Sequence, residues 1–146
     1  MKIYKNVLIL FISVFFYQNA FSQCNDINDY TALRALYLAT DGDNWINNSG
    51  WPEKVFFNAN PSPSPNTNLS NWYGIECTNG RVTRISLDDN NMRGQLPNLI
   101  GRLNALKFLN LSSNQIYGNL PTELSQLVNL EYLFFASNDF TGNIPI

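Results

Sequence analysis

The 146-residue sequence has no histidine, only two cysteines and few charged residues, which make up 14% of it. Without histidine it lacks the side chain that most often acts as a general base near neutral pH and as a zinc ligand. It also lacks a nucleophile paired with a base, a glycine-rich phosphate loop and a cluster with metal-ligand spacing. Asp88 and Asp89 could form the carboxylate pair of a glycoside hydrolase, but adjacent strand residues point to opposite faces. We therefore expect no enzyme, no metal and no cofactor.

Basic residues are scarce as well. Nine lysines and arginines stand against 11 acidic residues, and two of the nine, Lys2 and Lys5, lie at the very start. The chain after this start has seven basic side chains, a formal charge of −4 and no basic cluster. Nucleic acids and anionic membranes are therefore poor candidates for partners.

The apolar run from Val7 to Tyr17 has 11 residues, whereas a membrane-spanning helix needs about 20. Lys2 and Lys5 precede this run, and the small residues Ala20 and Ser22 follow it. This order predicts an export signal over residues 1–22, cleaved after Ser22. The mature chain, 124 of the 146 residues, is long enough for one compact domain. We expect it to be secreted or at the cell surface, with no membrane insertion after cleavage.

The two cysteines, Cys24 and Cys77, allow a single pairing within the chain. An exported protein meets an oxidising compartment, so we expect a disulfide between them. It would tie the start of the mature chain to the edge of the repeats and contribute about 3–4 kcal/mol by loop closure. Two free thiols, or pairing to another chain, are the alternatives.

The carboxy-terminal part of the sequence repeats every 24 residues. Three apolar segments, which begin at Val82, Leu106 and Leu130, align with one another. The same alignment superimposes three sets of residues: Asn90, Asn114 and Asn138; Gly94, Gly118 and Gly142; Pro97, Pro121 and Pro145. A fixed period with several residue types in phase predicts a stacked solenoid, in which each unit buries its apolar face against its neighbours.

Strand alternation within the second unit places Leu106, Leu109 and Leu111 inside. Asn114 follows where the chain must turn, and its amide can both donate and accept hydrogen bonds. We expect the asparagine column to satisfy backbone groups at buried turns. The glycine after it permits a tight backbone turn, and the proline fixes φ on the outer side. We therefore assign structural roles to the asparagine, glycine and proline positions that recur in each repeat.

Residues 23–80 differ from the repeats. Helical spacing of apolar residues predicts an amphipathic helix over 29–40, ended by Asp41-Gly42. Asp41 to Asn44 is a turn rather than a calcium loop, because the later oxygen ligands of such a loop are missing. Three tryptophans are expected to seal the open apolar end of the first repeat: Trp45, Trp51 and Trp72.

Two further segments complete this region. Residues 58–68 contain three prolines and almost no apolar side chain, which predicts an exposed loop with polyproline character. Residues 72–77 and 81–87 are expected to be strands of a hairpin, because Asn79-Gly80 can supply the positive φ values of a two-residue turn.

The pattern Leu-x-x-Leu-x-Leu-x-x-Asn-x-Ile-x-Gly-x-Leu-Pro from Leu106 to Pro121 resembles the plant-type leucine-rich repeat. The segments 29–51 and 72–77 are similar to the N-terminal caps of exported bacterial and plant members of this family. The resemblance implies an α/β solenoid with short parallel β-strands on a concave face, a helical cap over 23–80 and about two and a half repeats over 81–146.

Two departures from the family pattern are informative. Ser70 stands where plant caps usually have a cysteine, so the local cap disulfide is absent and the Cys24 to Cys77 pairing is favoured. The sequence stops at Ile146, inside the third repeat, so we expect an array truncated at its carboxyl end.

The resemblance implies recognition of a protein or peptide, or of a glycan, on the concave sheet. Stacked strands would present two outward columns of candidate ligand-binding residues: Arg84, Phe108 and Tyr132; Ser86, Asn110 and Phe134. Arginine and aromatic residues are enriched where binding energy concentrates, and these aromatics exceed what solubility requires. Ordinary exposed aromatics are the alternative. Ice binding is disfavoured because the columns do not repeat one residue type.

A second hypothesis is that the chain is the front end of a longer receptor or adhesin whose other parts lie beyond Ile146. Four apolar residues would otherwise end the stack without cover: Leu130, Leu133, Phe135 and Ile144.

Overall fold

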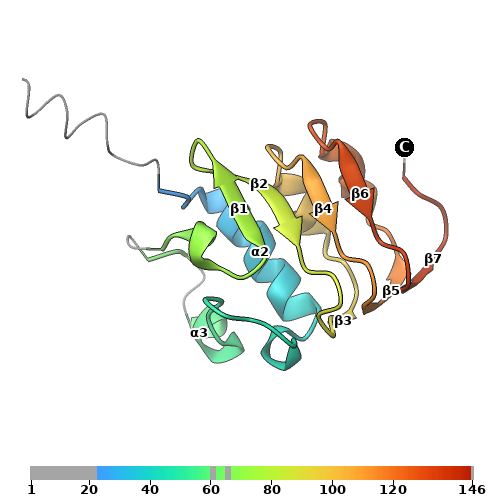
Figure 1. The fold of residues 1–146 in the computed structure, drawn as a ribbon, viewed down its shortest axis with the longest axis horizontal. Coiled ribbons are helices and arrows are strands. Elements are labelled where there is room, and N and C mark those ends of the chain that lie inside the picture. Colours follow the sequence, from blue (N-terminus) through green and yellow to red (C-terminus); the bar gives the residue numbers. More distant parts are fainter. Residues whose placement is uncertain (1–22, 60–61, 65–66, 146) are drawn as a thin grey trace, which may run out of the picture.

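The computed structural model describes residues 23–59, 62–64 and 67–145. The predicted export signal, residues 1–22, lies outside this part of the chain. Two sheets form the walls of a short solenoid, one with strand order β1-β2-β4-β6 and the other with order β3-β5-β7 (Figure 1). Within the described residues, no helix is both long and apolar enough to span a membrane.

Helix α2, Ile27–Ala39, is the helix predicted near the start of the mature chain. It begins two residues earlier than expected, because the Asp26 carboxylate caps it by accepting from the backbone N–H groups of Asn28 and Asp29. It ends where Asp41 takes a left-handed φ of 59° and the chain enters the 3-10 turn η1, Gly42–Asn44. Figure 1 shows α2 behind the first strands of the larger sheet, so it covers the amino-terminal end of the repeats.

An aromatic cluster fills the cap. All three tryptophans are buried, and their ring partners are other cap aromatics, with centroid distances between 4.7 and 6.1 Å among the six rings: Tyr30, Tyr37, Trp45, Trp51, Phe57 and Trp72. Burial raises the pKa of the Tyr37 hydroxyl, which therefore stays neutral and donates to Asp43.

Phe57 belongs to a short helix that the sequence analysis missed, α3, Lys54–Ala59. The proline-rich loop therefore starts later than predicted, after Ala59 instead of at residue 58. Parts of this loop, residues 60–61 and 65–66, lie outside the described residues.

The hairpin consists of β1, Ile75–Thr78, and β2, Arg81–Ser86, which pair antiparallel. Asn79 and Gly80 have φ values of 52° and 77°, as a two-residue hairpin turn requires. The expected strand start at Trp72 is wrong. Trp72 ends the 3-10 turn η2, Leu69–Asn71, and Gly74 turns the chain with a φ of 76° before β1 begins.

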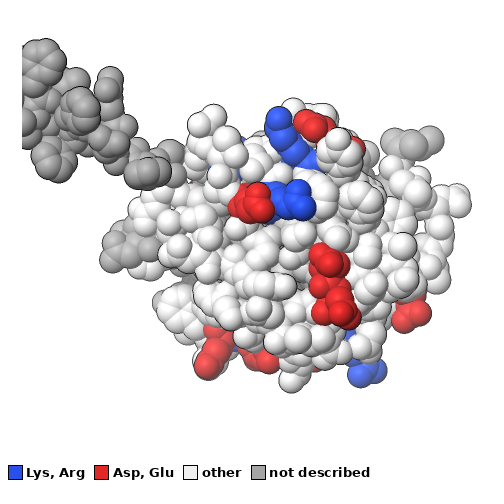
Figure 2. Space-filling model, in the orientation of Figure 1, with Lys and Arg blue, Asp and Glu red and all other residues white. Residues whose placement is uncertain are grey.

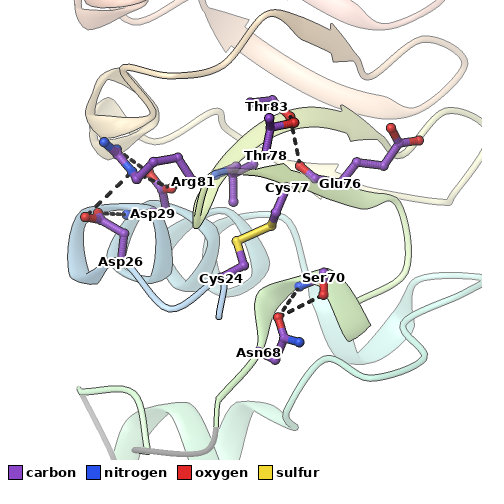
Figure 3. Close-up of a disulfide and its surroundings, with 11 residues drawn as sticks. Cys24, Asp26, Asp29, Asn68, Ser70, Glu76, Cys77, Thr78, Arg81 and Thr83 are labelled. Atoms are coloured by element: carbon purple, nitrogen blue, oxygen red, sulfur yellow. Dashed lines mark hydrogen bonds and ion pairs between the residues drawn. A yellow bond between two sulfur atoms is a disulfide. The ribbon is translucent and has the colours of Figure 1, made fainter. Parts of the chain in front are cut away.

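Two links join the cap to this hairpin (Figure 3). The predicted disulfide between Cys24 and Cys77 is present and closes a sequence separation of 53 residues. Asp29, 0% exposed, accepts from the Arg81 guanidinium at 2.8 and 3.0 Å and from the Val82 N–H at 2.8 Å. A buried carboxylate is tolerated because each oxygen is hydrogen-bonded. Ser70, in place of a cap cysteine, bonds to the Asn68 side chain.

The larger sheet continues with β4, Phe108–Asn110, and β6, Tyr132–Phe134, both parallel to β2. Arg84, Phe108 and Tyr132 are register partners, and so are the three residues Ser86, Asn110 and Phe134. The strand stacking predicted from the 24-residue period is therefore observed.

The sequence analysis did not predict the second sheet. It consists of β3, Arg93–Gly94, β5, Gln115–Asn119, and β7, Asp139–Thr141, in parallel. The convex side carries the 3-10 helices η3, Asn98–Arg102, and η4, Thr122–Gln126, each preceded by a repeat proline. Gly94 has a φ of 148°, and a Cβ there would collide with the carbonyl oxygen of Ala39. This glycine lets the first repeat approach the end of α2.

The asparagine column bridges successive units. Asn114 accepts from the N–H groups of Asn90 and Met92 in the preceding unit and donates to the carbonyls of Leu87 and Leu111. Asn138 makes the corresponding bonds one unit later, to the backbone at 111, 116 and 135. Asn90 instead bonds to the backbone of Asn47 in the cap. One side-chain type thus joins cap and repeats.

Candidate ligand-binding face

The concave face is the side of the larger sheet that points away from α2. The outward side chains of β2, β4 and β6 form its columns, and all six of them are partly or fully exposed. All six candidate residues from the sequence analysis lie on these three strands. Their role in binding remains a prediction.

The aromatic patch consists of Phe108, Tyr132 and Phe134. Phe108 lies 6.1 Å from Tyr132 and 5.5 Å from Phe134 between ring centroids, with tilted rings in both pairs. Tyr132 is 56% exposed and Phe134 is 45% exposed, while Phe108 is half-buried. Phe108 thus contacts both other rings, and none of the three belongs to the hydrophobic core cluster.

Arg84 lies over the aromatic patch. Its guanidinium carbon is 3.5 Å from the centroid of Phe108, which is cation–π geometry. Glu76, its register partner on β1, holds the same guanidinium from the other side at 3.6 Å. The hairpin therefore orients Arg84 and neutralises much of its charge.

A groove of ≈ 310 Å³ runs beside the patch at the amino ends of the strands. Its lining residues are Glu76, Thr78, Thr83, Arg84, Lys107, Phe108, Glu131 and Tyr132. Lys107 and Glu131 pair across it at 3.5 Å. The sequence analysis missed this pair, although the 24-residue period aligns Thr83, Lys107 and Glu131 in one column and so could have revealed it.

The opposite end of the face is acidic. Asp88 and Asp89 lie just beyond β2, after the buried Leu87, and are exposed, and Asp88 accepts from the Asn110 amide at 2.9 Å. Figure 2 shows acidic side chains gathered beyond this end of the strands. The sequence analysis treated Asp88 and Asp89 as adjacent strand residues that point to opposite faces, and this was wrong. Strand β2 ends at Ser86, and Asp89 has a left-handed φ of 50°, so strand alternation does not apply to them.

Two larger hollows lie in the cap. One, of ≈ 620 Å³, adjoins the disulfide, and the other, of ≈ 600 Å³, adjoins Tyr37 and Trp51. The aromatic residues of the second hollow are buried in the cap cluster. Neither hollow offers exposed rings, so the concave face is the better candidate for binding a partner.

Known proteins are similar to this chain in its repeat and its fold. The Leucine Rich Repeat family model matches residues 105–127. The structure of the BIR2 ectodomain from Arabidopsis thaliana superimposes with a TM-score of 0.65 at 31% identity, covering 82% of this chain and 60% of that one. The chain belongs to the plant-type leucine-rich repeat proteins.

Two further relatives are much longer than this leucine-rich repeat protein. Phytosulfokine receptor 1 from Arabidopsis thaliana is 33% identical over 116 residues, which is 72% of this chain and 10% of the relative. The ectodomain of the Arabidopsis thaliana receptor kinase GASSHO1/SCHENGEN3, solved in complex with CASPARIAN STRIP INTEGRITY FACTOR 2, has a TM-score of 0.62 at 32% identity. The match covers 80% of this chain and 13% of that one. Both of these solved structures, BIR2 and GASSHO1/SCHENGEN3, are ectodomains.

Proposed function

We propose that this leucine-rich repeat protein is an extracellular binding module, not an enzyme, and that its concave face recognises a protein or peptide. One observation carries the proposal: two exposed aromatic rings, Tyr132 and Phe134, both contact the half-buried ring of Phe108 on an open sheet face. A similar receptor ectodomain, GASSHO1/SCHENGEN3, is known in complex with a ligand, and another relative is named as a receptor. The predicted export signal and the disulfide favour a location outside the cell.

The aromatic patch can supply useful binding energy. Tyr132 and Phe134 each expose about half of their surface. Burying on the order of 100 Å² more of each ring at ~25 cal/mol per Å² stabilises a complex by ~2–3 kcal/mol per ring. The scaffold is rigid at this place because the strands are hydrogen-bonded on both sides of β4, so little ordering entropy opposes binding.

Peptide selection tests the proposal. The full chain, expressed with its leader and immobilised, is panned against a random twelve-residue phage-displayed library. We expect sequences to be enriched by the native chain and lost with the variant Phe108→Ser/Tyr132→Ser/Phe134→Ser. A matched control, Tyr117→Ser/Val128→Ser, removes exposed apolar side chains from other surfaces and should keep the enrichment. Circular dichroism of each variant checks that it folds.

Two results would contradict the peptide proposal. Enrichment that survives loss of the aromatic patch would place binding elsewhere on the molecule. Binding on a glycan array, without any peptide enrichment, would replace the peptide by a glycan as the ligand.

A longer receptor or adhesin is the second candidate. The support for it is that the chain spans only 10% of phytosulfokine receptor 1 and 13% of the GASSHO1/SCHENGEN3 chain. An antibody against the cap, used on the native source, measures the mass of the mature protein. A band well above the mass of residues 23–146 supports this candidate, and a band at that mass contradicts it.

A further inference from the structure

The charges of the concave face are not evenly distributed. Its two cationic side chains each have an acidic partner: Arg84 lies 3.6 Å from Glu76, and Lys107 lies 3.5 Å from Glu131. These pairs sit at the amino ends of the strands, where they neutralise one another. Figure 2 shows blue and red atoms adjacent there.

The carboxyl ends of the strands carry uncompensated negative charge. Among the ion pairs of the described residues, none involves Asp88 or Asp89. Asp88 instead accepts from the Asn110 amide, and Asn110 lies between Ser86 and Phe134 in the second column of the face. The negative end therefore adjoins Asn110, the register partner of Phe134 in the aromatic patch. A ligand on this face meets apolar rings and, next to them, two carboxylates.

We infer that the ligand of the concave face is an extended peptide in which an apolar side chain covers the aromatic patch and a nearby lysine or arginine reaches Asp88 and Asp89. This rests on the proposed function and specifies its ligand. Charge complementarity favours a basic residue in the ligand, because Asp88 and Asp89 carry the charge of this face that has no ion-pair partner. Acidic peptides and anionic glycans are disfavoured by the same field.

Strand geometry sets the spacing of the two ligand side chains. Phe134 and Asp88 are two strands and about two residues apart, which is ~12 Å between backbone positions at ~4.8 Å per strand and ~3.3 Å per residue. An extended peptide covers this distance with three to four residues at ~3.3 Å each. The basic residue should therefore follow or precede the apolar one by two to four positions, since its own side chain adds reach.

Defined peptides test the inference. The probes are nine-residue Gly-Ser peptides, acetylated and amidated, with one Phe and one Arg separated by one to six positions, and a second series with Glu in place of Arg. Titration of the ¹⁵N-labelled full chain, followed by amide shifts, detects weak binding at each residue. We expect the tightest binding at separations of two to four, and at least about fivefold weaker binding of the matching Glu peptides at low salt.

Variants locate the charge effect. Asp88→Asn/Asp89→Asn should abolish the preference for Arg over Glu, whereas Asp139→Asn, which removes one negative charge from the second sheet, should keep it. Equal affinity of Arg and Glu peptides, or no dependence on separation, would overturn the inference even if no variant folded. In that case shifts at the aromatic patch would still support peptide binding. Absence of shifts there with every peptide would overturn both proposals.

Discussion

The second and third repeats have the same sequence pattern but not the same burial. Leu106, Leu109 and Leu111 are fully buried, whereas their counterparts Leu130, Leu133 and Phe135 are half-buried. At the end of the pattern, one residue before each proline, Leu120 is 8% exposed and Ile144 is 57% exposed. The backbone register and the asparagine bonds are nevertheless repeated from one unit to the next.

This difference separates what a repeat determines from what its neighbour determines. The pattern within a unit sets strand position, turn and side-chain direction. Burial requires a following unit, because each layer is covered only by the next one along the stack. The first repeat shows the same rule at the other end, where α2 and the disulfide-linked cap take the place of a preceding unit.

Removal of the disulfide should have the largest effect, because it opens the covered end. Closing 53 residues contributes about 4 kcal/mol in the loop-entropy treatment, so Cys24→Ser/Cys77→Ser should lose about that much free energy of unfolding. Guanidinium unfolding with and without reductant measures it. Amide exchange of β2 should then rise toward that of β6. A midpoint unchanged by reductant would show that Asp29 and the aromatic cluster hold the cap unaided.

Matched leucine truncations test the comparison directly. Leu109→Ala should reduce the free energy of unfolding by about 3 kcal/mol and Leu133→Ala by about 1 kcal/mol, since only the first leaves an enclosed cavity. Urea denaturation at one protein concentration gives both values. Equal losses would mean that the third repeat is covered in solution, and light scattering over a range of concentrations would show whether a second copy covers it.

The asparagine column offers the next test. Asn114→Leu leaves the N–H groups of Asn90 and Met92 without a partner in the buried turn, so we expect a loss of about 2 kcal/mol. Asn138→Leu should cost less, about 1 kcal/mol, because the Asn138 bonds to Leu111, Ile116 and Phe135 are only part-buried and its bond to Ala136 is exposed. Thermal unfolding of the two variants decides the order. A larger loss for Asn138→Leu than for Asn114→Leu would contradict this expectation and would mean that the asparagine in the last repeat contributes more to stability.

The sequence predicted the parts of the fold that depend on local patterns. The 24-residue period gave the register of Arg84, Phe108 and Tyr132, and Asn79-Gly80 gave the hairpin turn. The pairing of Cys24 with Cys77 followed from cysteine number and compartment. Each of these rests on a residue type with few physical alternatives.

Features that depend on three-dimensional neighbours were missed. The strands of the second sheet are two to five residues long, and glycines at 94 and 118 obscure their strand character. Helix α3 has six residues, too few for a helical period to appear. On the candidate face, the pairing of Glu76 with Arg84 depends on hairpin register and that of Lys107 with Glu131 on repeat register. Charge pairs of this kind follow from topology, so they can be inferred only after the fold is known.

The smallest effect is expected where the third repeat faces outward. Phe134→Ser removes a ring that contacts Phe108 at 5.5 Å but lies outside the core, so the free energy of unfolding should fall by no more than about 1 kcal/mol. Its neighbour Phe135 packs edge-on against Phe140 toward the core, so Phe135→Ser should cost more. Differential scanning calorimetry compares the two. If Phe134→Ser is as damaging as Phe135→Ser, the aromatic patch belongs to the folding core, and its exposure no longer argues for a ligand. If only Phe135 matters for folding, then stability does not explain an aromatic residue at position 134, and the result supports its assignment to recognition.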